Sequence, residues 1–133
     1  MATALSMNCS QIQKSQNHSA KMVELICSIL NDAKVDYIRN GYSNGLKGTL
    51  NLSFRGKDGE AILHRLDLRG ILVSTGSACD SNSVQVSHVI RAINVPDSYA
   101  KGTIRISLGK DNTIEEAKII GETLVSVLME QKK

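Results

Sequence analysis

The sequence predicts an α+β fold, with a small, mainly antiparallel sheet of three or four strands and helices packed on one face of that sheet. Segments with apolar residues at helical spacing interleave with short segments that alternate apolar and polar residues. The chain has 133 residues, of which 41% are hydrophobic, and this length suits one core rather than two. We therefore expect a single domain over residues 1–133. The other face of its sheet would meet solvent or a partner.

The first half of the chain is predicted to contain two helices and two strands. Residues 2–31 lack proline and glycine, and their apolar residues recur on one helical face. Strands are expected at 35–38 and 50–54, on either side of a glycine-rich turn at 41–48. Asp58 is a candidate N-cap for a helix that stops at Gly70. The apolar side of this second helix consists of Ala61, Ile62, Leu66 and Leu68.

The second half of the chain is predicted to contain two more strands and two more helices. Residues 71–74 are predicted as a strand that leads into a loop of small polar residues at 75–83. A helix is expected to end before Pro96, and residues 102–109 alternate again as a strand. Thr113 and Glu116 have the spacing of a capping box, so the last helix should begin at Thr113. Its predicted buried face consists of Ile114, Ala117, Ile120, Leu124 and Val127.

Composition argues against nucleic-acid and membrane partners. The formal net charge of +3 comes from lysines and arginines scattered among acids, and aromatic residues make up only 3% of the chain. Neither a basic stripe nor a base-stacking platform is therefore expected. The sequence has no apolar run of about 18 residues and no signal-peptide layout. We expect a cytoplasmic protein.

The cysteines and histidines do not have the spacing of a disulfide framework or a metal site. The three cysteines are an odd number without a CxxC pair, so at least one thiol should be free. They are Cys9, Cys27 and Cys79. The histidines at positions 18, 64 and 88 show no metal-ligand spacing and are predicted as surface or boundary residues. We expect no metal.

Cys79 differs from Cys27 in its surroundings. It lies among small polar residues between a predicted strand and a predicted helix, which indicates an exposed thiol on a mobile loop. Cys27 has apolar neighbours and is predicted to pack in the core. An exposed thiol can attack a substrate and carry the product elsewhere, if a neighbour lowers its pKa or supplies a base. An incidental loop cysteine remains the alternative.

Arg105 lies in the middle of a predicted strand, between Ile104 and Ile106. Strand alternation places its side chain on the opposite face from both isoleucines. The guanidinium then either faces water or binds a carboxylate, because a planar cation is costly to bury without a partner. A free thiol and a carboxylate-binding arginine together would suit a small amino acid or thiol acid as substrate.

Residues 74–79, Ser-Thr-Gly-Ser-Ala-Cys, resemble the cysteine-loop motif of NifS/IscS-type cysteine desulfurases, which are class V aminotransferases of PLP-dependent fold type I. Three further segments match that family in order: 87–93, 102–109 and 112–116. Residues 50–54 with Gly59 and Glu60 also fit, so the resemblance covers most of the chain. The loop length is closer to the NifS/IscS group than to the shorter-loop SufS group. The matching part of such an enzyme is its C-terminal small domain.

The resemblance implies an activity and roles for two residues. Enzymes of this family use pyridoxal phosphate to remove sulfur from L-cysteine, which gives L-alanine and an enzyme persulfide. Cys79 would carry the persulfide, and Arg105 would bind the substrate carboxylate. The sulfur would pass to an iron–sulfur scaffold or another acceptor protein. Family members are homodimers.

The sequence lacks one part of that family's pattern. The large N-terminal domain of the family contains a serine-x-histidine-lysine stretch, whose lysine holds the cofactor, and no histidine here is followed by lysine. We therefore expect the PLP-binding large domain to be absent, and this chain alone to bind no cofactor and to be inactive. The alternative is a stand-alone sulfur carrier or interaction module that accepts persulfide sulfur in trans. A decayed fragment is a third possibility.

Overall fold

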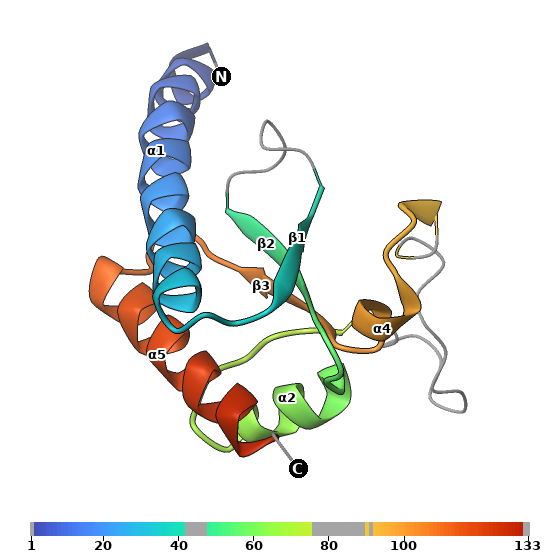
Figure 1. Cartoon of the computed structure of the whole chain (residues 1–133). Helices are drawn as coiled ribbons and strands as arrows, with labels where there is room; N and C mark the ends of the chain where they lie inside the picture. Colours follow the sequence, from blue (N-terminus) through green and yellow to red (C-terminus); the bar gives the residue numbers. More distant parts are fainter. Residues whose placement is uncertain (1, 42–47, 76–89, 91, 132–133) are drawn as a thin grey trace.

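The computed structural model describes residues 2–41, 48–75, 90 and 92–131, with side chains from residue 12 onward. Within this part of the chain there are four helices and a three-stranded sheet. In chain order the elements are α1 (Ala2–Asp32), β1 (Tyr37–Asn40), β2 (Thr49–Phe54), α2 (Gly59–Asp67), α4 (Asp97–Ala100), β3 (Thr103–Ser107) and α5 (Ile114–Glu130), as Figure 1 shows. The predicted α+β class is confirmed.

The sheet is antiparallel, in the order β1-β2-β3. Leu50 of β2 lies opposite Ile106 of β3, and Leu52 lies opposite Ile104. Directly opposed residues share a face of the sheet, so these four side chains form one apolar surface together with Phe54. All five are at most 2% exposed, which confirms the alternation that predicted β2 and β3.

Helices α1 and α5 pack against each other and cover this apolar face (Figure 1). Ile26 and Leu30 of α1 and Leu124 of α5 are fully buried in the shared core. The two helices approach closely at Gly121, where an added Cβ would lie 2.8 Å from Cδ1 of Ile29. Among the helices that the structure describes, none has both the length and the apolar character needed to cross a membrane.

The predicted helix caps of α2 and α5 are confirmed. The Asp58 side chain accepts a hydrogen bond from Glu60 N at 3.0 Å. Thr113 and Glu116 form the reciprocal capping box of α5, with both hydrogen bonds at 3.1 Å. Each bond satisfies an N–H group that has no partner within its own helix.

One helix boundary and two buried positions were predicted wrongly, whereas the left-handed conformation predicted for Gly70 is confirmed. Helix α2 ends at Asp67, and Gly70 has φ +80° in the turn that follows. Leu68, predicted on the apolar side of this helix, is 86% exposed because it follows the last helical turn. Ile114, predicted as buried, is the first residue of α5 and is 42% exposed.

The predicted strand at 71–74 is reduced to one antiparallel bridge between Ser74 and Arg105. Ile71 and Val73 of this segment pack against the core, whereas Leu72 between them is 81% exposed. The short helix α4 was not predicted. It follows Pro96, whose carbonyl oxygen accepts hydrogen bonds from Tyr99 N and Ala100 N. The predicted turn at 41–48 and the helix before Pro96 lie mostly outside the described residues.

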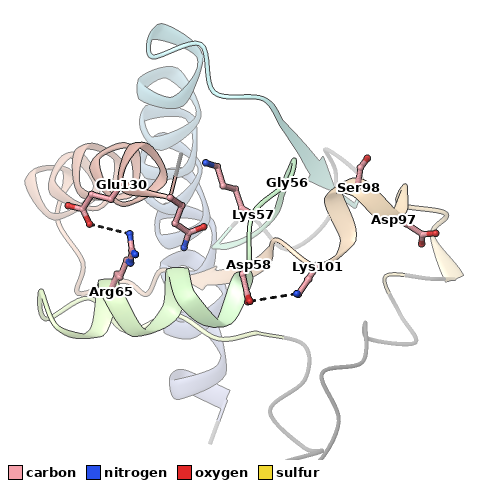
Figure 2. A pocket seen from close by; sticks show the side chains of 9 residues that line it. Gly56, Lys57, Asp58, Arg65, Asp97, Ser98, Lys101 and Glu130 are labelled. Carbon is pink, nitrogen blue, oxygen red and sulfur yellow. Dashed lines mark hydrogen bonds and ion pairs between the residues drawn. The ribbon is translucent and has the colours of Figure 1, made fainter. Parts of the chain in front are cut away.

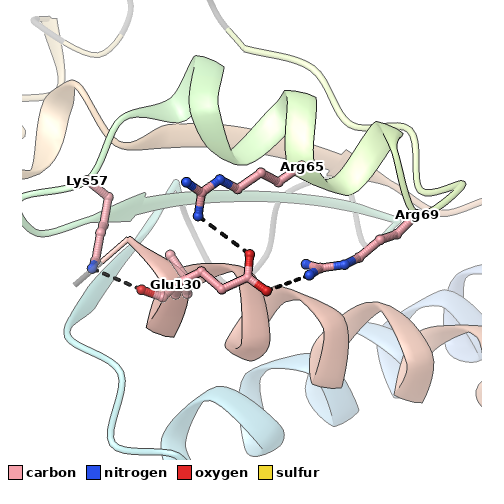
Figure 3. A network of polar contacts seen from close by, with 5 residues as sticks. Lys57, Arg65, Arg69 and Glu130 are labelled. Carbon is pink, nitrogen blue, oxygen red and sulfur yellow. Dashed lines mark hydrogen bonds and ion pairs between the residues drawn. The ribbon is translucent and has the colours of Figure 1, made fainter. Parts of the chain in front are cut away.

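A polar network holds the end of α5 against α2 and the turn before it (Figure 3). Lys57 Nζ donates to the carbonyl oxygen of Leu128 at 3.0 Å, which satisfies one acceptor at the helix C-terminus. Glu130 pairs with Arg65 at 3.5 Å and with Arg69 at 2.5 Å. These ion pairs are partly exposed, so each contributes little to stability.

Gly102 allows the turn before β3 to touch the end of β2, and its substitution should destabilise the fold. A Cβ at this position would lie 2.3 Å from the carbonyl oxygen of Phe54, a backbone atom that cannot rotate away. We expect Gly102→Ala to lower the free energy of unfolding by about 2 kcal/mol or more, measured by urea denaturation. Gly109→Ala is the matched control, because the nearest atom there is 3.8 Å away. Its effect should be at most about 1 kcal/mol in either direction. Equal stability of the two variants would contradict the steric argument.

Candidate functional site

The sheet face opposite the core is polar and is joined by a chain of hydrogen bonds. Asn40 Nδ2 donates to Ser53 Oγ at 2.8 Å, and Ser53 Oγ lies 2.7 Å from Thr103 Oγ1. Thr103 Oγ1 in turn donates to the carbonyl oxygen of Ala100 at 2.7 Å. A hydroxyl has only one hydrogen to donate, so Ser53 must be the donor to Thr103. This series of hydrogen bonds therefore joins β1, β2 and β3, with each donor pointing toward the Ala100 carbonyl oxygen. It also satisfies the two hydroxyls that are buried on this face.

Arg105 projects from the middle of this face. Its neighbours along β3, Ile104 and Ile106, are buried on the core side, whereas Arg105 is exposed and pairs in register with Asn51 of β2. The predicted division of β3 into two faces is confirmed.

The guanidinium of Arg105 makes no ion pair with any described residue. The four other arginines in the described part of the chain all pair with carboxylates. An exposed guanidinium of this kind can bind a carboxylate with two parallel hydrogen bonds. Whether it does so stays a prediction.

The start of the predicted cysteine loop is bonded directly to Arg105. Ser74 N donates to Arg105 O at 3.0 Å, and Arg105 N donates to Ser74 O at 2.7 Å. The next residue, Thr75, donates through Oγ1 to Glu60 Oε1 at 2.7 Å. Cys79 and His88 lie outside the described residues, so the expected exposure of Cys79 stays a prediction.

Cys27 is a core residue, as predicted. Its side chain is 7% exposed, on the inner side of α1. Burial raises the pKa of the Cys27 thiol, and the charge of Arg39 and a hydrogen bond with Tyr37 offset this only in part. The neutral thiol is thus favoured, which makes Cys27 a poor nucleophile.

The described histidines have structural positions. His18 Nε2 lies 2.7 Å from the carbonyl oxygen of Asn112, so this nitrogen carries the proton and ties α1 to the turn before α5. His64 is exposed in the last turn of α2. Within the described ranges, no three His, Cys, Asp or Glu side chains are grouped as metal ligands would be.

Two hollows formed by described residues lie away from Arg105. Figure 2 shows a charged pocket of about 590 Å³ between the turn before α2, α4 and the end of α5. Its cations already have partners: Lys57 binds Leu128 O, Arg65 pairs with Glu130, and Lys101 lies 3.9 Å from Asp58. A more apolar groove of about 420 Å³ lies between residues 69–72 and α5.

Comparison with known proteins identifies the family. The sequence model of aminotransferase class V matches residues 1–120. The cysteine desulfurase IscS of Dictyoglomus turgidum is 45% identical over 92 residues, which cover 69% of this chain and 23% of that protein. IscS of Methanosarcina thermophila is 29% identical over 128 residues, 96% of this chain and 32% of that protein.

Solved structures show the same fold. A NifS-like protein superposes with a TM-score of 0.76 at 28% identity, covering 97% of this chain and 32% of its own. The NifS-like protein from Rickettsia africae superposes with a TM-score of 0.70 at 26% identity, covering 90% of this chain and 31% of its own.

The chain therefore belongs to the aminotransferase class V family, and the relatives it matches are cysteine desulfurases of the IscS/NifS type. This confirms the resemblance seen in the sequence. The chain spans about a quarter to a third of the length of those relatives.

The buried position of Cys27 predicts slow alkylation. In the native chain we expect iodoacetamide to modify Cys27 at least about tenfold more slowly than in the same chain unfolded in urea, because the site must open before the thiol reacts. Peptide mass spectrometry after a time course at constant pH measures the two rates. Equal rates would show that Cys27 is accessible in the folded protein.

Proposed function

We propose that these residues form the small domain of a cysteine desulfurase, in which Arg105 binds the carboxylate of L-cysteine and Cys79 accepts its sulfur. The pairing of Ser74 with Arg105 is the observation that carries this proposal. It means that the segment leading to Cys79 starts beside the candidate carboxylate-binding residue. The five residues that follow Ser74, up to Cys79, can span at most about 18 Å, so the thiol can reach a substrate held near Arg105. The desulfurase relatives support the same assignment.

The backbone on both sides of Arg105 is fixed, which favours a binding role. Arg105 pairs with Asn51 on one side and with Ser74 on the other. The side-chain hydrogen bond between Ser53 and Thr103 joins the same two strands close to Arg105. A planar guanidinium on a rigid strand loses little conformational freedom when it takes up a carboxylate.

The proposed transfer balances without an external oxidant or reductant. The C–S bond of L-cysteine breaks, an S–S bond forms to Cys79 Sγ, and the carbon takes up a proton. The products are L-alanine and a Cys79 persulfide. A thiolate of an acceptor protein, such as an iron–sulfur scaffold, would then attack the outer sulfur and leave Cys79 as a thiol.

Pyridoxal phosphate would supply an electron sink for breaking the C–S bond, but the described residues do not fit this cofactor. A Schiff base needs a free lysine, and no lysine is bonded to Arg105 or pairs with it in register. Lys57 and Lys101 line the charged pocket and interact there with Leu128 O and Asp58. The cofactor would be held by other residues, in a large domain against which the polar sheet face packs. We propose a homodimeric cytoplasmic enzyme, as the family resemblance implies.

Cys79 should carry the transferred sulfur. We expect this chain, assembled with a PLP-binding large domain and given L-[³⁵S]cysteine, to gain one labelled sulfur atom at Cys79, detected by non-reducing peptide mass spectrometry. Cys79→Ser should abolish the label, and Cys9→Ser should keep it. Label at another cysteine would contradict the assignment. Labelling by a separate complete desulfurase, without assembly, would instead favour the stand-alone carrier.

Replacement of Arg105 should weaken substrate binding. In the same assembled enzyme we expect Arg105→Lys to raise the KM for L-cysteine about tenfold or more, because an ammonium cannot form the paired hydrogen bonds of a guanidinium. Arg39→Lys is the matched control, since Arg39 is an exposed strand arginine that pairs with Glu24. Steady-state alanine formation gives both constants. An unchanged KM would remove Arg105 from the substrate site.

A further inference from the structure

Thr75 and Glu60 join the start of the cysteine loop to helix α2. The Thr75 hydroxyl donates to a Glu60 carboxylate oxygen at 2.7 Å, in a partly buried position. A hydrogen bond to a charged acceptor is stronger than one between neutral groups. The bond lies four residues before Cys79 in the sequence.

Glu60 lies on a rigid part of the domain. It is in the first turn of α2, where Asp58 caps the helix and Gly59 N donates to Lys101 O at 2.9 Å. The backbone at Gly59 presses against β3 so closely that an added Cβ would lie 2.6 Å from Thr103 O. The backbone that carries Glu60 is therefore fixed relative to the strand that carries Arg105.

Two consecutive residues are thus held to two different elements. Ser74 pairs with the backbone of Arg105, and Thr75 bonds to α2. Neighbouring residues of an extended chain point to opposite sides, so Ser74 faces the same side as Arg105 while Thr75 faces the helices. Restraint of both residues fixes the position and the direction of the chain where it leaves the sheet.

We infer that Thr75 and Glu60 are positioning residues for sulfur transfer. Their hydrogen bond sets the direction in which the chain leaves Arg105 toward Cys79. This role rests on the proposed function of Cys79, and neither residue needs to touch the substrate. Loss of the bond should affect how often the thiol reaches the substrate, and not how tightly the substrate carboxylate binds.

A distance measurement tests the positioning without any activity. Spin labels are attached to Cys79 and to a cysteine introduced by Ser107→Cys, on the exposed side of β3, in a background with Cys9→Ser and Cys27→Ala. We expect Thr75→Val to broaden or shift the electron–electron distance distribution, whereas Thr75→Ser, which keeps the hydroxyl, leaves it unchanged. Thr113→Val is the control, since it removes the capping hydroxyl of α5 and should alter stability alone. Identical distributions for Thr75→Val and the parent would overturn the inference.

Kinetics of the assembled enzyme provide the second test. We expect Thr75→Val to slow formation of the Cys79 persulfide about threefold to tenfold. This is the change in rate that corresponds to the net free energy of one hydrogen bond. The KM for L-cysteine should stay unchanged, and Thr75→Ser should restore the rate. An unchanged rate, or a changed KM alone, would refute a positioning role. If the unsubstituted enzyme forms no persulfide, the proposed function fails, and the distance measurement decides the positioning by itself.

Discussion

The backbone pairing of β3 is the interaction on which the rest of the structure depends. On one side β3 pairs with β2 along its whole length, and on the other side it bonds to Ser74. Gly59 and Gly102 let the neighbouring backbones come close, because a Cβ at either position would collide with a carbonyl oxygen. A single strand therefore supplies part of the core, the exposed Arg105 and the attachment of the cysteine loop.

The inner face of the sheet stabilises the fold, and the outer face carries the candidate site. The inner face is aliphatic, and its burial provides the main driving force for folding. The outer face satisfies its buried hydroxyls internally through Ser53 and Thr103, so it can keep a polar surface at little cost. Arg105 has no carboxylate partner among the described residues and is exposed, so water solvates its charge. A substrate carboxylate or a partner domain can replace that water without disturbing the core.

Sequence patterns predicted the parts of the fold that depend on local periodicity. The alternation around Leu52 and Ile104 and the capping box at Thr113 all appear in the structure. The strand expected at 71–74 is only one bridge, because pairing depends on neighbours that are distant in sequence. The four-residue helix α4 is too short to show a helical period. The bond between Thr75 and Glu60 left no sequence signal, because it joins residues 15 positions apart that belong to different elements. Residue type and context singled out Cys79 as a possible nucleophile and Arg105 as a possible carboxylate ligand, and only the family resemblance chose these roles over the alternatives.

The shortness of the bridge at Ser74 explains why a side-chain contact beside it matters. Two backbone hydrogen bonds hold Ser74, each worth about 1 kcal/mol in net stability. A four-residue strand would add further backbone hydrogen bonds, but in this segment only Ser74 is paired with β3. The bond from Thr75 to a carboxylate is of similar or greater strength than either backbone bond. A side chain on α2 is therefore part of the geometry of a site on the opposite face of the sheet.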